Sequence, residues 1–338
     1  MKSKNANKLN LLLEQYHMKI NSIVIRYKFL LLLPFLFFLL SESIATDGYN
    51  SFYQVQNSSK EYVFISDTQD LLPFESLWNI TNNNREVRQI IYNDIIEHKP
   101  VSVFHMGDLV ARAYKEKYWQ DFDQFHNRLN QNEISFHPVL GNHELIIFPK
   151  KGESKFQERF PQHSRTGYLV RVDSLAVILL NSNFGKMSED EITKQNNWYD
   201  KTLDELDSDS SIKIIAIGTH YSPYTNSKRV SPSKDVQQYF VPGYLNSKKA
   251  KLFFSGHSHA FEHFIIEGKN FLVIGGGGGP QQPLLVGEDA RWKDNFNSED
   301  EYRRFHYIRL VKEADDYIVN VIMIDSTYSK LVNIYQIR

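Results

Sequence analysis

Between residues 62 and 254, short apolar runs alternate with longer stretches whose apolar residues recur at helical spacing. Such runs, apolar throughout and bounded by polar residues, predict strands that are buried on both faces. They occupy residues 62–65, 101–104, 214–217 and 252–254. The stretches 86–97 and 191–206 carry apolar residues on one helical face and predict amphipathic helices.

Residues 168–172 and 175–181 predict two adjacent strands with a tight turn at Asp173-Ser174. Past His259 the helical spacing disappears, and short polar turns such as 267–270 join some of the strands that we expect there. These strands are 264–266, 271–274, 306–311, 317–324 and 331–337. Alternating βα units before a strand-rich tail indicate an α/β fold, a four-layer αββα sandwich with two stacked mixed β-sheets. We expect residues 46–338 to form one domain, because no repeat or linker interrupts them.

The amino-terminal segment differs from the rest of the chain. Residues 29–40 are almost entirely Leu and Phe, with Lys and Arg before them and Ser43-Ile44-Ala45 after them. This order predicts a secretory signal peptide over residues 1–45, with Met18 as a possible true start. The apolar run is short for a membrane span, which needs about 20 residues, but an uncleaved membrane anchor remains the alternative. We therefore expect an exported protein, either periplasmic or extracellular.

Charge and cysteine content narrow the possible functions. Lys and Arg number 39 and Asp and Glu number 40, so there is no basic excess that would indicate nucleic-acid binding. The chain has no Cys, which excludes a cysteine nucleophile and a thiolate zinc site. A hydrophobic fraction of 41% is sufficient for a large core without disulfides.

Five short polar islands carry the residue types that bind metal, and most of them follow an apolar run. They are Asp67-Thr68-Gln69, Gly107-Asp108, Gly141-Asn142-His143-Glu144, Gly218-Thr219-His220 and Gly256-His257-Ser258-His259. In open α/β sheets the loops at the carboxyl ends of the strands converge on one crevice. Ligands that are far apart in the sequence can therefore meet there, which predicts a dinuclear metal centre at the strand ends.

The ordered set of islands resembles the calcineurin-like metallophosphoesterase superfamily over essentially the whole chain after residue 45. Residues 256–262, followed by Gly275 to Gly279, are most similar to purple acid phosphatases and their relatives. The resemblance implies two divalent metal ions, each with its own set of ligands and with Asp108 bridging them. The first set is Asp67, Gln69, Asp108 and His259, and the second set is Asp108, Asn142, His220 and His257. A bridging carboxylate offsets the repulsion between two dications, and a hydroxide shared by both ions attacks the phosphorus.

The resemblance also implies that His143 protonates or stabilises the leaving oxygen. Two positions depart from the family pattern. Gln69 stands where the superfamily usually has His, and its harder oxygen ligand favours Mn or Fe, or Mg, over Zn. Ala111 stands where purple enzymes have a Tyr, so we expect a colourless protein.

The expected function is that of an acid phosphatase-like hydrolase acting on small phosphate monoesters. Two alternatives stay open: a phosphodiesterase or pyrophosphatase acting on nucleotides or phospholipid headgroups, and a non-catalytic binding protein with the same fold. The expected partner is a small phosphoester, and a membrane only if the amino-terminal segment is not cleaved. Loops 221–247 and 280–300 are expected to select the substrate.

Some residues near the islands allow two interpretations. Tyr221 and His263 follow predicted ligands closely, and they either line the substrate cleft or pack in the core, with packing favoured. The run Gly275 to Gly279 is either structural or adjacent to the substrate, because it lacks the Lys and Ser or Thr of a nucleotide-binding P-loop.

Overall fold

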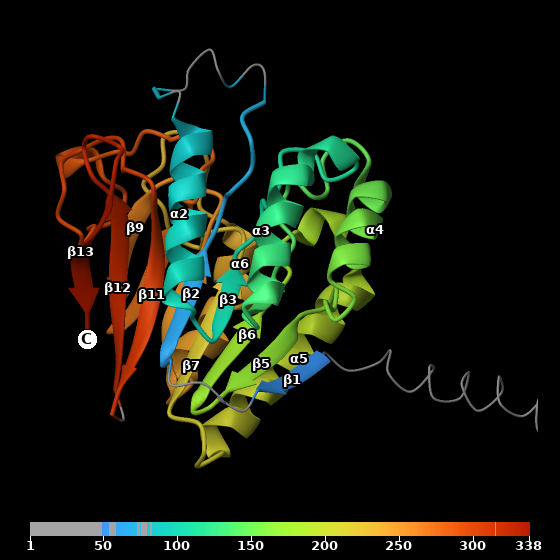
Figure 1. Cartoon of the computed structure of the whole chain (residues 1–338). Helices are drawn as coiled ribbons and strands as arrows, with labels where there is room; N and C mark the ends of the chain where they lie inside the picture. The colour runs from blue at the N-terminus through green and yellow to red at the C-terminus, as the bar shows by residue number, and fades with distance from the viewer. Residues whose placement is uncertain (1–48, 54–58, 73–74, 76–79, 82, 315) are drawn as a thin grey trace, which may run out of the picture. The chain divides into compact units, whose positions relative to one another are not determined.

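The computed structural model describes residues 49–53, 59–72, 75, 80–81, 83–314 and 316–338 (Figure 1). The predicted signal peptide over residues 1–45 and the possible start at Met18 lie outside the described residues. Gly48–Arg338 form one compact unit. Within the described ranges, no helix has the length and apolar character needed to cross a membrane.

Two mixed β-sheets form the centre of this unit (Figure 1). The smaller sheet has the strand order β13-β12-β11-β2-β3-β4, in which β2, β3 and β4 are parallel and β11 to β13 are antiparallel. Its strands are β13 (Leu331–Ile337), β12 (Asp316–Ile324), β11 (His306–Glu313), β2 (Glu61–Ile65), β3 (Ser102–His105) and β4 (Ser135–Pro138).

The larger sheet has the order β1-β5-β6-β7-β8-β10-β9. Its strands are β1 (Tyr49–Tyr53), β5 (Tyr168–Val172), β6 (Leu175–Leu179), β7 (Ile214–Thr219), β8 (Ala250–Ser255), β10 (Lys269–Ile274) and β9 (Phe261–Ile266). Strands β6, β7, β8 and β10 are parallel, whereas β5 runs antiparallel to β6 and parallel to β1, and β9 runs antiparallel to β10. Parallel strands carry their carboxyl ends to one edge of each sheet, and the site is built at that edge.

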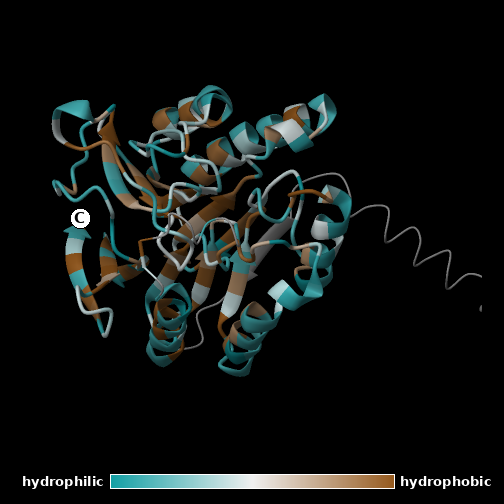
Figure 2. Ribbon diagram, turned by 90° about the horizontal axis from the view of Figure 1, so that it is seen from above, coloured by the Kyte–Doolittle hydropathy of each residue, from teal (hydrophilic) through white to brown (hydrophobic). Residues whose placement is uncertain are grey.

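Helices cover the outer face of each sheet. In Figure 2 the helices carry many polar residues, drawn in teal, whereas the strands between them are mostly apolar, drawn in brown. One apolar core joins the smaller sheet to α2 (Asn84–His98), α3 (Gln120–Gln131) and α4 (Pro149–Arg159). A second core joins the larger sheet to α5 (Glu189–Ser208), α6 (Lys234–Tyr239) and α7 (Val241–Asn246). A third core lies between the sheets, which confirms the four-layer αββα sandwich. Short 3₁₀ turns occur at η2 (Glu116–Tyr118), η3 (Phe184–Lys186) and η4 (Gly287–Asp289).

Strand β2 shows why the apolar runs are continuous. Val63 and Ile65 pack against the helices, whereas Tyr62 and Phe64 pack between the two sheets. Successive side chains of a strand point to opposite faces, so a strand buried on both faces must be apolar at every position. The interpretation of these runs as buried strands is therefore confirmed.

Both predicted helices and the predicted strand pair are present. The helix predicted over 191–206 is α5, which begins with a capping box between Ser188 and Glu191. The turn between β5 and β6 places Asp173 at a φ of 54°, and β6 ends at Leu179 rather than at residue 181. Strands β1 and β4 and helices α3, α4, α6 and α7 were not predicted from the sequence. Strand β4 is only Ser-Phe-His-Pro, too short to give a periodic signal.

Candidate metal centre

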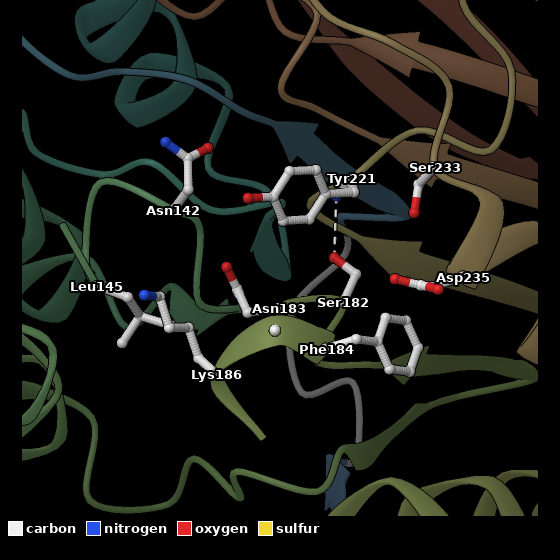
Figure 3. Close-up of a pocket in the computed structure, with 10 residues that line it drawn as sticks. Asn142, Leu145, Ser182, Asn183, Phe184, Lys186, Tyr221, Ser233 and Asp235 are labelled. Carbon is white, nitrogen blue, oxygen red and sulfur yellow. Dashed lines mark hydrogen bonds between the residues drawn. The ribbon is translucent and has the colours of Figure 1, made fainter. Parts of the chain in front are cut away.

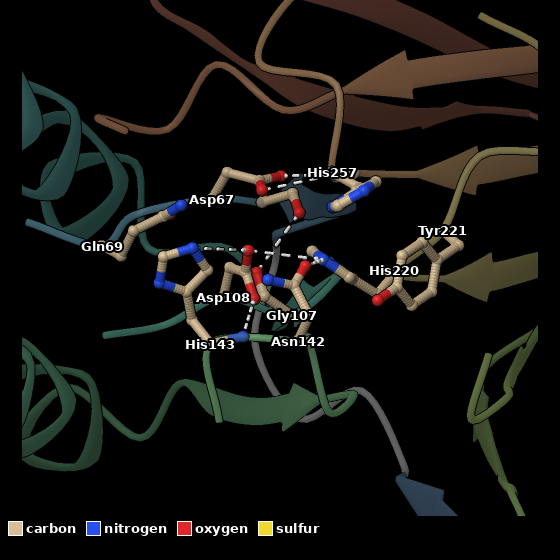
Figure 4. A network of polar contacts seen from close by, with 12 residues as sticks. Asp67, Gln69, Gly107, Asp108, Asn142, His143, His220, Tyr221 and His257 are labelled. Atoms are coloured by element: carbon tan, nitrogen blue, oxygen red, sulfur yellow. Dashed lines mark hydrogen bonds and ion pairs between the residues drawn. The ribbon is translucent and has the colours of Figure 1, made fainter. Parts of the chain in front are cut away.

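The polar islands lie at the carboxyl ends of β2, β3, β4, β7 and β8 or in the loops that follow these strands, and their side chains converge (Figure 4). Two groups of side chains could each hold a metal ion, with the ligand atoms of each group within 4.8 Å of one another. The groups are Asp108, His220 and His257, and Asp67, Asp108 and His259. Asp108 belongs to both groups, as a carboxylate that bridges two ions would.

The first group surrounds the carboxylate of Asp67. His259 places Nε2 3.2 Å from Asp67 Oδ1, while its Nδ1–H donates to the carbonyl oxygen of Pro280 at 2.6 Å. That second hydrogen bond fixes the tautomer and leaves Nε2 available as a ligand. Burial lowers the pKa of His259, but the charges of Asp67 and Asp108 together with the hydrogen bonds to Asp67 and Pro280 outweigh burial, so the pKa is raised.

Gln69 fits a metal-binding role through an orphaned oxygen. Its side chain is fully buried, Nε2 lies 3.2 Å from Nε2 of His259, and Oε1 has no hydrogen-bond partner in the described structure. A buried amide oxygen without a partner costs free energy. Rotation of the amide by 180° brings Oε1 to the side of His259, where a cation held by Asp67 and His259 would satisfy it.

The second group surrounds Asp108. His220 places Nε2 2.9 Å from Asn142 Oδ1 and 3.4 Å from Asp108 Oδ2, and its Nδ1–H donates to the carbonyl oxygen of Met106 at 2.8 Å. The ring of His257 lies 5.1 Å from the ring of His220. All four predicted ligands of the second ion therefore lie together.

Electrostatics in the second group suit a cation. Burial lowers the pKa of His220, but the charges of Asp108 and Asp67 together with the hydrogen bonds of the ring outweigh burial and raise that pKa to about 9. Burial, together with the positive charge of His220, lowers the pKa of His257 to about 3. The carboxylate of Asp108 keeps its pKa below the ordinary range despite burial, because His220 and His143 face it. A dication bound at Asp108 would replace the proton on His220 as the positive charge that faces this carboxylate.

Three of the predicted ligands have a left-handed backbone: Asp67 with a φ of 58°, Asp108 with 56° and His257 with 67°. Hydrogen bonds from the backbone N–H group hold Asp67 and His257 in this conformation. Asp67 N–H donates to Gly107 O at 3.1 Å, and His257 N–H donates to Asp67 Oδ2 at 3.0 Å. Non-glycine residues in this region are strained and cluster at functional sites, so the strain agrees with a ligand role.

Glu144 anchors the loops around Asp108, a role that the sequence analysis did not assign. Its buried carboxylate accepts the backbone N–H groups of Asp108 at 2.9 Å, Leu109 at 2.9 Å, Gly141 at 2.8 Å and Val110 at 3.4 Å. Burial and the charge of Asp108 raise the pKa of Glu144 to about 7. The carboxylate therefore ties the loop after β4 to the loop after β3.

The glycine run packs directly against the ligand loops. A Cβ at Gly276 would lie 2.1 Å from Nδ1 of His306, and one at Gly277 would lie 2.3 Å from Ser66 O. Gly277 N–H donates to Ser66 O at 2.9 Å, and Gly279 N–H donates to Asp67 O at 2.8 Å. Of the two interpretations of this run, the geometry favours the structural one, because a side chain has no room.

His143 lies beside the two candidate ligand groups, and its Nε2 is the ring nitrogen that could exchange a proton with a substrate. Nδ1–H donates to Ala111 O at 2.9 Å, and Nε2 lies 3.9 Å from Asp108 Oδ2. Its backbone N–H donates to Asp108 Oδ1 at 2.8 Å, so the ring and the bridging carboxylate are held together. The predicted acid and the predicted bridging residue are therefore neighbours.

Tyr221 and His263 have different surroundings. The ring of Tyr221 lies 4.4 Å from the ring of His257, and Tyr221 lines a pocket beside the metal centre. Both ring nitrogens of His263 are engaged, Nδ1 with the Tyr335 hydroxyl and Nε2 with Asn270 Oδ1, each at 2.9 Å. His263 is not among the residues that line this pocket, which agrees with packing.

The pocket has a volume of about 380 Å³ and adjoins Asn142 (Figure 3). Its other lining residues are Leu145, Ser182, Asn183, Phe184, Gly185, Lys186, Tyr221, Ser233 and Asp235. Ser182 accepts the backbone N–H groups of His220 at 3.1 Å and Tyr221 at 2.9 Å. The sequence analysis missed this loop, although Asn181-Ser182-Asn183 follows the apolar strand β6 as the islands follow theirs.

Residues 61–261 match the calcineurin-like phosphoesterase family, and the chain belongs to this family. The match includes all five islands and supports a metal-dependent phosphoesterase. No curated protein sequence matches the chain at a significant level.

Solved structures share the fold at low sequence identity. A purple acid phosphatase from yellow lupin (Lupinus luteus) seeds superposes with a TM-score of 0.57 and 16% identity, over 83% of this chain and 55% of that chain. GAP50, the anchor in the inner membrane complex of Plasmodium, superposes with a TM-score of 0.58 and 14% identity, over 82% of this chain and 87% of that chain. A dimetal phosphatase from Danio rerio superposes with a TM-score of 0.55 and 11% identity, over 83% of this chain and 98% of that chain. The chain thus spans about half of the lupin protein, and these likenesses establish the fold.

Proposed function

We propose that this protein is an exported phosphatase that hydrolyses small phosphate monoesters with two divalent metal ions. The observation that carries the proposal is the position of Asp108, which belongs to both ligand groups and lies beside His143. The proposed ligands are Asp67, Gln69, Asp108, Asn142, His220, His257 and His259. The oxygen donors, including Gln69, favour Mn or Fe over Zn.

The residues have separate roles in this reaction. When bound, the metal pair neutralises phosphoryl charge and acidifies the attacking water. Asp108 would hold both ions and reduce their mutual repulsion. His143, with Nδ1–H fixed on Ala111, presents Nε2 to the departing oxygen and gives it a proton.

Hydrolysis of p-nitrophenyl phosphate and of its bis ester tests the proposal against the diesterase alternative. With Mn²⁺, we expect the monoester to be hydrolysed faster than the bis ester. Faster hydrolysis of the bis ester would favour a phosphodiesterase. Absence of hydrolysis with several metals and a broad panel of phosphoesters would favour a non-catalytic binding protein, a possibility that agrees with the anchor role named for GAP50.

Export is supported by the apolar run 29–40 between basic residues and Ser43-Ile44-Ala45. Amino-terminal sequencing of the protein from its native cells tests it. We expect the mature chain to begin near Thr46. A chain that retains residues 29–40 and partitions with membranes would favour the uncleaved anchor.

A further inference from the structure

The pocket beside the metal centre contains a hydrogen-bond acceptor whose orientation is fixed. Asn183 is 4% exposed, and its Nδ2 donates to Leu140 O at 2.8 Å and to Asn181 Oδ1 at 3.0 Å. Both partners are acceptors, so turning the amide over would set oxygen against oxygen. Oδ1 has no hydrogen bond within the described part of the chain and points into the pocket (Figure 3).

Further hydrogen bonds hold Asn181 and thereby Asn183. Asn181 Nδ2 donates to Arg165 O at 3.1 Å, which leaves Asn181 Oδ1 facing Asn183. The buried side chain of Gln195 accepts from Asn181 N–H and donates to Asn181 O, both at 2.9 Å. The acceptor of Asn183 is therefore placed by a rigid network rather than by a mobile loop.

Asp235 and Ser233 supply further polar groups, on the other side of Ser182 in the view of Figure 3. Asp235 lies in the first turn of α6, and its carboxylate has no hydrogen bond or ion pair among the residues described. Ser233 Oγ accepts the N–H of Val236 at 3.2 Å, so its own proton can be donated to a ligand. The polar lining is thus dominated by acceptors.

The remaining lining combines apolar surface with one cation and the polar side chains of Asn142 and Ser182. Leu145, Phe184 and Tyr221 provide apolar surface, and Lys186 is the single cationic residue that lines the pocket. A volume of about 380 Å³ lies at the small end of the range of roughly 300–1,000 Å³ for small-molecule sites. The pocket therefore suits a compact group with an apolar face and several hydrogen-bond donors.

We infer that this pocket binds the leaving alcohol of a phosphate monoester and that this alcohol carries further hydroxyl groups, as in a polyol or a sugar. Asn183 and Asp235 accept hydrogen bonds from those hydroxyls and act as specificity-determining residues. The inference rests on the proposed phosphatase function. An alcohol without further hydroxyls would displace water from the buried acceptor of Asn183 and leave it unpaired, which is the basis of strong discrimination in enzyme sites.

Two esters that differ only in the hydroxyls provide the test. Glycerol 3-phosphate and n-propyl phosphate have the same carbon chain and the same phosphoryl group. We expect wild-type protein loaded with Mn²⁺ to prefer glycerol 3-phosphate by at least about tenfold in kcat/KM. A ratio near one, or a preference for propyl phosphate, would overturn the inference.

Substitutions show which residue causes the preference for glycerol 3-phosphate. Asp235→Ala is expected to bring the ratio of the two kcat/KM values toward one, whereas Asp235→Asn, which keeps one acceptor oxygen, should give an intermediate ratio. Asp204→Ala removes an exposed carboxylate in α5, outside the pocket, and should leave the ratio unchanged. A wild-type ratio in Asp235→Ala would contradict the role of Asp235.

Failure of the proposed function is distinguishable from failure of the inference. If no monoester, including p-nitrophenyl phosphate, is hydrolysed, the phosphatase proposal is wrong. The dissociation constants of the same two esters, measured by calorimetry on the manganese-loaded protein, then test the pocket. Tighter binding of glycerol 3-phosphate by about tenfold or more supports it, and equal binding overturns it.

Discussion

The Glu144 carboxylate accepts the backbone N–H of Asp108 with Oε2 2.9 Å from the nitrogen, and this contact joins the loops that follow β3 and β4. The same carboxylate accepts Leu109 N–H at 2.9 Å and Gly141 N–H at 2.8 Å. The bridging residue of the proposed metal centre is therefore held by a buried acid that is itself no ligand. The positions of the loops around the proposed metal centre therefore depend on Glu144.

Replacing Glu144 by Gln is expected to destabilise the protein. The amide NH₂ would face backbone N–H donors, and hydrogen bonds of this charged kind contribute about 1.5–3 kcal/mol. We expect the free energy of unfolding, measured by urea denaturation, to fall by about 2–3 kcal/mol. Glu97→Gln, on the exposed face of α2, is the control. An unchanged urea midpoint in Glu144→Gln would show that these hydrogen bonds do not anchor the loops.

His143→Ala is expected to keep both metals and to lose turnover. Removal of a general acid lowers the rate by about 10²–10⁴-fold. Elemental analysis of the purified variant and its kcat on an alkyl ester, n-propyl phosphate, whose leaving oxygen needs a proton, give the two readouts. His98→Ala, which removes an exposed histidine at the end of α2, should change neither. Turnover at the wild-type rate would remove His143 from the mechanism.

Gln69→His is expected to shift metal preference toward Zn²⁺. Imidazole is a softer ligand than an amide oxygen, and it would stand beside Nε2 of His259. Competition between Mn²⁺ and Zn²⁺, read by elemental analysis, should give a higher Zn fraction than in the wild type. Gln238→His places a histidine at an exposed position in α6 and should retain the wild-type fraction. No change in Gln69→His would argue against Gln69 as a ligand.

His163→Phe is expected to reduce acid sensitivity. Burial, with the charge of Arg165, lowers the pKa of His163 from 6.5 to about 3. Between these values the unfolded chain binds a proton that the folded chain does not, so stability falls as the pH falls, by roughly 1.4 kcal/mol per pH unit. The Phe variant lacks this proton, and its ring can keep the contact with Phe156.

Urea denaturation at pH 7 and at about pH 4.5 measures this difference. We expect the wild type to lose about 2–3 kcal/mol more stability than His163→Phe between the two conditions. His98→Phe, at an exposed position, should behave as the wild type. Equal losses in the wild type and His163→Phe would mean that His163 is not buried as a neutral ring.

The iron-loaded protein is expected to be colourless. The position of the tyrosinate ligand of purple enzymes is occupied by Ala111, which is fully buried and offers only its carbonyl, to His143. Visible absorption spectra of the protein with one equivalent of Fe³⁺ test this expectation. A violet band would require a tyrosine ligand from elsewhere in the chain.

The layers and the ligand loops could be predicted from sequence because their signals are local. An apolar run followed by Asp, Asn or His predicts both a buried strand and a potential metal ligand at the carboxyl end of that strand. The role of Glu144 could not be predicted, since its hydrogen bonds join residues that are 36 positions apart. The Asn181–Asn183 loop had the same local pattern, but Asn and Ser are common in ordinary turns and gave no distinct signal.

The backbone hydrogen bonds that join the glycine run to Ser66 and Asp67 have a consequence for the rigidity of the site. The glycine run follows β10 of the larger sheet, and Ser66 and Asp67 follow β2 of the smaller sheet. A sliding movement of one sheet over the other would therefore break these bonds and shift Asp67 away from His259.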